Sequence, residues 1–135
     1  MAADKVEFEL VSPERLLLSE QVDMVVVPGA EGDFGVLPRH APLISTLRPG
    51  VIRVFEGREI KNRIFVAGGF AEVTPERCTV LAEEAVPVRD IDTGALDQEI
   101  KDIGEDLADA KTDEEKAALA KRLAVRQAMR AAAVA

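Results

Sequence analysis

The sequence predicts an N-terminal antiparallel β-sandwich followed by a C-terminal antiparallel two-helix hairpin. Up to residue 89, short apolar and β-branched segments recur at intervals of roughly 8–12 residues, with Gly and Pro between them, which is typical of a sandwich or barrel. From residue 90 onward the apolar residues follow a helical period instead. We therefore expect two domains, residues 1–89 and 90–135.

The first predicted strand shows the clearest alternation in the sequence. Within Lys5–Val11, the apolar side chains of Val6, Phe8 and Leu10 would share one face and the charged side chains the other, as in a half-buried strand. A hairpin is expected around Glu56-Gly57, which separates two apolar runs. The other predicted strands are residues 15–19, 21–27, 51–55, 60–66, 70–74, 78–82 and 85–89.

A stretch rich in Gly and Pro, Val25–Gly50, interrupts this series. After its opening strand it is predicted to form a rigid exposed loop and not a helix. Gly32 and Gly35 enclose Asp33, so a bent backbone would present this carboxylate. Two prolines enclose His40, which predicts an extended display of the only histidine. We expect this stretch to be a contact surface.

Two helices are predicted after the change of pattern. The apolar residues of the first are spaced by four, three, four and three, which is one stripe of a helix; they are Leu96, Ile100, Ile103, Leu107 and Ala110. Lys111-Thr112 interrupts the pattern, and Thr112 with Glu115 has the form of a capping box. The second, alanine-rich helix is expected from Lys116 to about Ala133.

The two predicted helices differ in charge. Residues 92–115 contain ten acidic and two basic residues, whereas residues 116–130 contain five basic residues and no acidic one. Packed antiparallel, the helices would attract each other weakly along their flanks. Two short helices bury too little apolar surface to be stable alone, so we expect the hairpin to dock on the sandwich or on a partner.

Composition argues against several classes of function. The net charge of −8 and the absence of Trp and Tyr disfavour nucleic-acid binding, and no apolar run approaches the length of a membrane span. With one His and one Cys, the sequence lacks a nucleophile–base pair, a metal-ligand cluster and a P-loop, so no catalytic residue, metal or cofactor is expected. Cys78 is interpreted as a small buried hydrophobic residue. The N-terminus has no apolar signal region, so the protein should be soluble.

Several short motifs resemble one family. Residues 28–37 read Pro-Gly-x-Glu-Gly-x-Phe-Gly-x-Leu, residues 40–43 read His-Ala-Pro-Leu, and Gly-Gly-Phe-Ala-Glu-Val occupies residues 68–73. In this order and spacing they resemble the epsilon subunit of bacterial F-type ATP synthase, the equivalent of the mitochondrial delta subunit. The resemblance is closest over the first two-thirds of the sequence.

The resemblance implies a non-catalytic rotor subunit of the central stalk. It implies that the sandwich joins the gamma subunit to the membrane c-subunit ring, with Glu31, Asp33 and His40 at the ring and stalk contacts. It also implies a peripheral location on the cytoplasmic face of the bacterial inner membrane, without insertion into the bilayer.

The resemblance implies two further roles for the hairpin. The helices of this family can block ATP hydrolysis by contacting the alpha and beta subunits of the catalytic head, and Arg122, Arg126 and Arg130 form a suitable basic stripe. Some members bind ATP through Ile-Asp-x-x-Arg-Ala. Here Ile91 and Asp92 fit this motif, but Ala95 replaces the arginine, which removes the obvious phosphate partner.

Two alternatives to the rotor function remain. One is a regulatory module that senses ATP through the hairpin, and the other is a small enzyme that uses the His40 loop. Binding of labelled ATP would distinguish the first from the rotor function, and the sparse chemistry disfavours the second.

Overall fold

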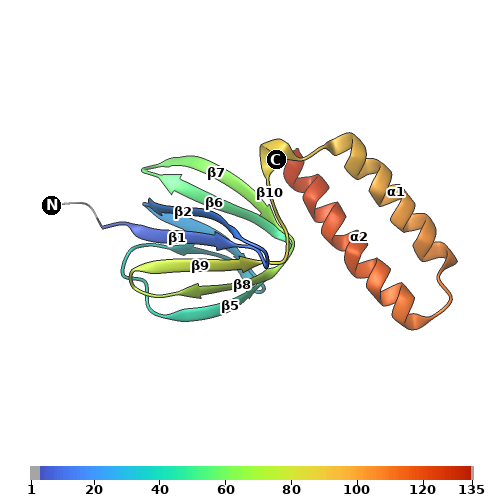
Figure 1. Ribbon diagram of the computed structural model, residues 1–135, viewed down its shortest axis with the longest axis horizontal. Coiled ribbons are helices and arrows are strands. Elements are labelled where there is room, and N and C mark those ends of the chain that lie inside the picture. Colours follow the sequence, from blue (N-terminus) through green and yellow to red (C-terminus); the bar gives the residue numbers. More distant parts are fainter. Residues whose placement is uncertain (1–3, 135) are drawn as a thin grey trace. The chain divides into compact units, whose positions relative to one another are not determined.

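The computed structural model describes residues 4–134. The protein divides into two compact units, one ending at Val88 and the other beginning at Arg89. Figure 1 shows strands throughout the first unit and two helices in the second. The strands are β1 (Val6–Val11), β2 (Leu16–Val22), β3 (Met24–Gly29), β4 (Gly32–Val36), β5 (Leu43–Leu47), β6 (Gly50–Glu56), β7 (Glu59–Val66), β8 (Gly69–Val73), β9 (Arg77–Ala82) and β10 (Ala85–Pro87).

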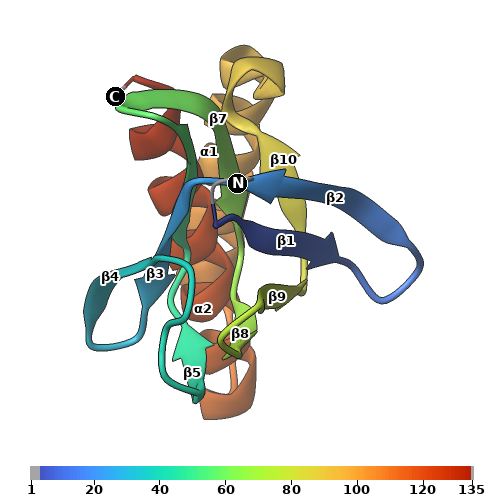
Figure 2. The same cartoon turned by 90° about the vertical axis from the view of Figure 1, so that its left-hand side faces the viewer.

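The strands form one continuous sheet, and Figure 2 shows that this sheet is curled. Its order is β10-β7-β6-β3-β5-β8-β9-β1-β2, and β4 pairs with β3. The predicted sandwich is thereby confirmed. One pair differs from an antiparallel arrangement, because β1 runs parallel to β9, with Phe8 opposite Cys78 and Leu10 opposite Val80. Alternation along a strand shows which face is buried but not the direction of the neighbouring strand.

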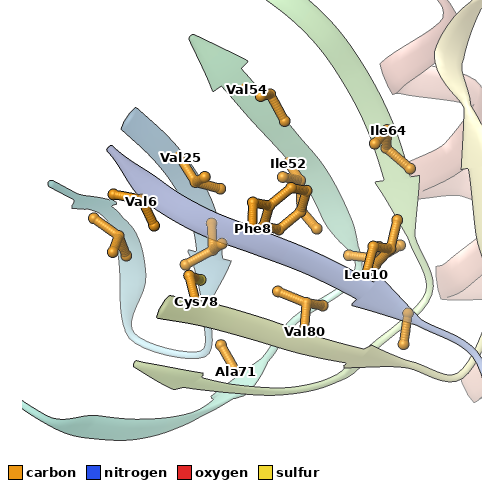
Figure 3. Close-up of a cluster of buried hydrophobic side chains, with 14 of the residues drawn as sticks. Val6, Phe8, Leu10, Val25, Ile52, Val54, Ile64, Ala71, Cys78 and Val80 are labelled. Carbon is orange, nitrogen blue, oxygen red and sulfur yellow. The ribbon is translucent and has the colours of Figure 1, made fainter. Parts of the chain in front are cut away.

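The core lies on the inner face of the curled sheet. The alternating residues of β1 that were predicted to share a face, Val6, Phe8 and Leu10, are all buried. Figure 3 shows Phe8 beside Ile52 of β6, among side chains that belong to strands on both sides of the curl. Cys78 belongs to this cluster, as the sequence predicted. Burial raises the pKa of its thiol to about 12.

Three local predictions were wrong. The Gly- and Pro-rich stretch is not mainly loop, because β4 and β5 lie within it, paired to β3 and β8. Pairing with a distant strand here outweighs low intrinsic propensity. The segment around His40 is a turn and not extended, since the His40 N–H donates to the Leu37 carbonyl at 3.2 Å. The boundary between the second and third strands, predicted at residue 20, lies at Asp23 instead, between β2 and β3.

The 3₁₀ turn η1 (Val88–Asp90) spans the boundary between the two units, and the second unit contains α1 (Thr93–Asp109) and α2 (Asp113–Ala133). The N-cap of α1 is Asp92, whose side chain accepts the Ala95 N–H at 3.1 Å. Thr112 caps α2 in the same way by accepting the Glu115 N–H at 3.1 Å. The predicted hairpin and its capping residue are therefore confirmed, and α2 begins three residues earlier than expected because its acidic first turn is helical.

Candidate functional site

The turn between β3 and β4 carries two of the predicted contact residues. Gly29 and Gly32 face each other across it, leaving Ala30 and Glu31 at the tip. A Cβ on Gly29 would lie 2.7 Å from the Gly32 carbonyl oxygen, and Gly32 has a φ of +143°, so both positions require glycine. Glu31 is exposed at the tip. Asp33 is not in a loop, because it lies in β4 opposite Pro28.

Two arginines hold the carboxylate of Asp33. Arg48, which follows β5, donates from Nη2 to Asp33 Oδ1, and Arg53 of β6 donates from Nη2 to Asp33 Oδ2 at 3.3 Å. Arg48 also donates from Nη1 to the Gly29 carbonyl. Local sequence offers no sign of these contacts, because the arginines are 15 and 20 residues away from Asp33. The predicted carboxylate is thus engaged within the sheet.

His40 lies at the other end of the strands. The β3–β4 turn adjoins Leu47, the last residue of β5, whereas the loop of His40 leads into Leu43, its first residue. The five residues of β5 separate the two places by about 13 Å. In the His40 loop, the Arg39 N–H donates to the Pro75 carbonyl at 2.7 Å, and His40 Nδ1–H donates to the Ala41 carbonyl at 2.7 Å. Glu31, Asp33 and His40 therefore do not form one site.

The outer face of the sheet carries a row of apolar side chains that was not predicted from the sequence. Cross-strand pairing brings Phe70 opposite Leu81, Leu81 opposite Val11, and Val11 opposite Leu16, so the row crosses β8, β9, β1 and β2. Phe70 is 45% exposed, Leu81 38% and Leu16 55%. Ile44 of β5 lies on the same face, opposite Glu72. We call Phe70, Leu81, Val11 and Leu16 the outer apolar row.

A signal for this row was present in the sequence. Val80-Leu81-Ala82 is apolar without interruption, although only Val80 and Ala82 belong to the core. An apolar residue on the outer face of a half-buried strand breaks the expected alternation. A contiguous exposed apolar surface of this kind commonly marks a protein interaction site.

The three arginines of the predicted inhibitory stripe contact acidic residues of α1. Arg122 Nη2 lies 3.0 Å and Arg126 Nε 3.2 Å from Glu99 Oε2, and Arg130 Nε lies 2.7 Å from Asp97 Oδ1. Arg130 lies later in α2 than Arg122, but its partner Asp97 lies earlier in α1 than Glu99. The two helices are therefore antiparallel. The attraction predicted between their flanks is observed as these specific pairs.

Other groups offer little chemistry. A shallow hollow of about 410 Å³ on the outer face is lined by Glu72, Thr74, Glu76, Arg77 and Thr79, without a histidine or cysteine. In residues 4–134, no group of three or more His, Cys, Asp or Glu residues is placed to hold a metal ion. Neither described helix has a segment long and apolar enough to cross a membrane.

Comparisons with known proteins agree with this architecture. Residues 5–88 match the family model of the β-sandwich domain of the ATP synthase delta/epsilon chain, and residues 92–134 match that of the C-terminal domain of the ATP synthase epsilon chain. The ATP synthase epsilon chain of Rhodospirillum centenum is 59% identical over 131 residues, covering 93% of this chain and 90% of that protein. That of Rhodospirillum rubrum is 54% identical over 130 residues, covering 96% and 97%.

Solved structures share the fold at low sequence identity. A subunit of the mitochondrial ATP synthase of Euglena gracilis, solved as OSCP/F1/c-ring, superposes with a TM-score of 0.82 at 23% identity, covering 96% of this chain and 82% of that one. A subunit from the central stalk and c-ring of the Tetrahymena thermophila mitochondrial enzyme gives 0.66 at 15% identity, covering 98% and 99%.

The two matched domains define a subunit of an F-type ATP synthase. More particularly, the protein belongs to the family of ATP synthase epsilon chains. The resemblance seen in the sequence motifs is therefore confirmed.

Proposed function

We propose that this protein is a non-catalytic rotor subunit that joins the gamma subunit to the membrane c-subunit ring. The outer apolar row is the observation that carries this proposal, because it offers an open apolar surface for a partner that remains bound. The row would lie against gamma, and the β3–β4 turn with Glu31 and Asp33 would face the loops of the ring. The His40 loop, at the other end of the strands, would provide a second stalk contact.

This function places the protein on the cytoplasmic face of the bacterial inner membrane, held there by its partners. Similar epsilon chains belong to bacteria such as Rhodospirillum, which supports this location. The structural relatives are named as parts of assemblies with a c-ring, which supports the ring as a partner.

Replacing Phe70 and Leu81 together by Ser tests the gamma contact. The parent protein should restore ATP-driven ion pumping to membranes whose ATP synthase lacks its epsilon subunit. The amount of protein retained on the complex is then compared, and it should be lower for the double variant than for the parent. Val134→Ser is a matched control, since Val134 is 72% exposed but lies outside the row. Equal retention of the double variant would contradict the gamma contact, provided that its melting temperature equals that of the parent.

We also propose that the hairpin restrains ATP hydrolysis when α2 leaves α1. Arg122, Arg126 and Arg130 already pair with carboxylates in the closed hairpin. In the open hairpin, acidic loops of the alpha and beta subunits would take the place of Glu99 and Asp97 as partners of these arginines. Replacing the three arginines by Gln should raise ATP hydrolysis by the complex without changing its subunit content. Hydrolysis equal to that of the parent would mean that the hairpin is only a brace.

Nucleotide sensing through Ile91 and Asp92 remains the alternative proposal. The carboxylate of Asp92 caps α1 by accepting the Ala95 N–H, and the position of Ala95 provides no cation for a phosphate group. We therefore expect labelled ATP to bind the isolated protein weakly or not at all. Saturable binding that Asp92→Ala abolishes would favour the sensing function.

A further inference from the structure

Two arginines lie side by side on the outer face of the sheet, in strands β6 and β7. Ile52 and Val54 of β6 belong to the core, and Figure 3 shows them there together with Ile64 of β7. Because neighbouring residues of a strand face opposite sides of the sheet, Arg53 and Arg63 point outward. The two arginines are directly opposite each other in the β6–β7 pairing.

This arrangement is unfavourable for the isolated protein. Residues directly opposite in an antiparallel pair have Cβ atoms about 4.5–5.5 Å apart, and like charges so placed destabilise a sheet. Asp33 compensates only one of them, because it accepts from Arg53 Nη2 at 3.3 Å and is shared with Arg48. The exposed side chain of Arg63 forms no hydrogen bond or ion pair with any other residue of the described range 4–134. The three arginines and Asp33 together carry a net charge of about +2.

The binding of Asp33 shows what kind of group would suit the opposed arginines. Arg48 donates to one oxygen of this carboxylate and Arg53 donates to the other, so a single carboxylate bridges two guanidinium groups. Arg53 and Arg63 form a second pair of guanidinium groups, in adjacent strands. A second carboxylate would bridge them in the same way, because the planar guanidinium matches the geometry of a carboxylate.

The residues around the pair would strengthen such a contact. Val26 of β3 lies opposite Arg53, and Val51 precedes Arg53 by two residues on the same face; both valines are half-buried. Apolar side chains reduce the access of water, and charges attract more strongly where water is scarce. Gly35 of β4, opposite Val26, has no side chain, so this end of the row leaves room for a partner.

We propose that Arg53 and Arg63 together bind an acidic side chain of another subunit of the ATP synthase complex. This contact goes beyond the proposed contacts with gamma and the ring. The pair lies on β6 and β7, which the sheet order separates from the strands of the outer apolar row. The net charge of −8 favours a protein partner over an anionic bilayer, which would repel the protein as a whole.

Thermal melting of the full-length isolated protein tests the unfavourable pairing. Arg63→Gln should melt about 1–3 °C above the parent, because the substitution removes one of two opposed charges. The difference should shrink at high salt. Arg58→Gln is the matched control, since Arg58 is exposed in the β6–β7 turn and its side chain also has no partner in the described part of the chain. An equal or lower melting temperature for Arg63→Gln would overturn the inference.

The contact itself is tested with the assembled ATP synthase complex. A carbodiimide joins an amine to a carboxylate that touches it, so Arg63→Lys supplies an amine at the proposed site. Mass spectrometry should locate a cross-link between position 63 and an Asp or Glu of another subunit. The same treatment of Arg58→Lys should give no such cross-link from position 58. Arg63→Gln should also weaken binding to a complex that lacks its epsilon subunit, by about two- to fivefold.

Two cross-linking results would overturn the inference: no cross-link from position 63, or a cross-link only to carboxylates of the same chain. Flotation of the isolated parent protein with phosphatidylglycerol vesicles, if Arg63→Gln abolished it, would instead assign the pair to lipid headgroups and would also overturn the inference. Failure of the proposed rotor function would look different, because the parent protein itself would then not bind the complex.

Discussion

Glu99→Gln should loosen the helical hairpin, because the Glu99 carboxylate pairs with both Arg122 and Arg126 of α2. The pair with Arg122 is largely exposed, with side-chain exposures of 57% and 33%, and should contribute at the low end of about 0.2–1 kcal/mol. The pair with Arg126 is better shielded, since that side chain is only 18% exposed, and should contribute near the upper end. Together they favour the closed hairpin by about 1 kcal/mol, a factor of about five in population.

The change can be followed in the isolated protein by spin labels on cysteines that replace Lys101 of α1 and Lys121 of α2, both exposed. Cys78 need not be removed, because it is buried with a pKa raised to about 12. Glu99→Gln should broaden the distance distribution and increase its long-distance population about fivefold. The difference from the parent should shrink at high salt, since screening weakens the same pairs.

Asp102→Asn is the matched control. Asp102 lies on the same helix and loses the same charge, but it accepts a hydrogen bond from Gln98 of α1 at 2.9 Å and pairs with no residue of α2 within the described part of the hairpin. Its distance distribution should equal that of the parent. If Glu99→Gln and Asp102→Asn change the distribution equally, general charge on α1 and not the specific pairs controls the hairpin.

Three further predictions concern the sandwich. Cys78 should resist alkylation at pH 8 in the native protein and react after denaturation, as mass spectrometry would show. The hydrogen bond from Lys5, together with the Gly57 N–H, lowers the pKa of Asp23. The ionised Asp23 carboxylate therefore stabilises the folded protein at pH values above the carboxyl pKa of the unfolded state, and this contribution is lost as the pH falls through the pKa of the folded state. Asp23→Asn should accordingly reduce the drop in melting temperature on acidification to about pH 3. A truncated protein ending at Val88 should melt cooperatively; a broad, non-cooperative transition would mean that the sandwich needs the helices.

Strands with strong alternation could be predicted because their local sequence already divides into a buried and an exposed face. β1 is the clearest case, with three apolar residues in the core and acidic residues between them. β4 could not be predicted in this way, since Gly32 and Gly35 have low strand propensity. Its strand conformation depends on pairing with β3, which local sequence does not encode.

The candidate sites show the same division between chemistry and geometry. The motif identified Glu31 and Asp33 as acidic residues at a turn, and the structure places both there or next to it. Their different environments depend on Arg48 and Arg53, which only the folded sheet brings close. The pairing of Arg130 with Asp97 across 33 residues was foreseen only as a general attraction between oppositely charged helices.

The parallel pairing of β1 with β9 has a consequence for the order in which the sandwich can form during synthesis. The core side chains of β1 lie beside residues about seventy positions later, so the N-terminal strand has no neighbour on that side until Ala82 has left the ribosome. The β1–β2 hairpin must wait with Phe8 and Leu10 uncovered, while β6 and β7 can already pair through their short turn. Contacts this distant in sequence slow folding. Closure of the sheet by β9 is therefore a late step, and the nascent polypeptide exposes the apolar face of β1 until then.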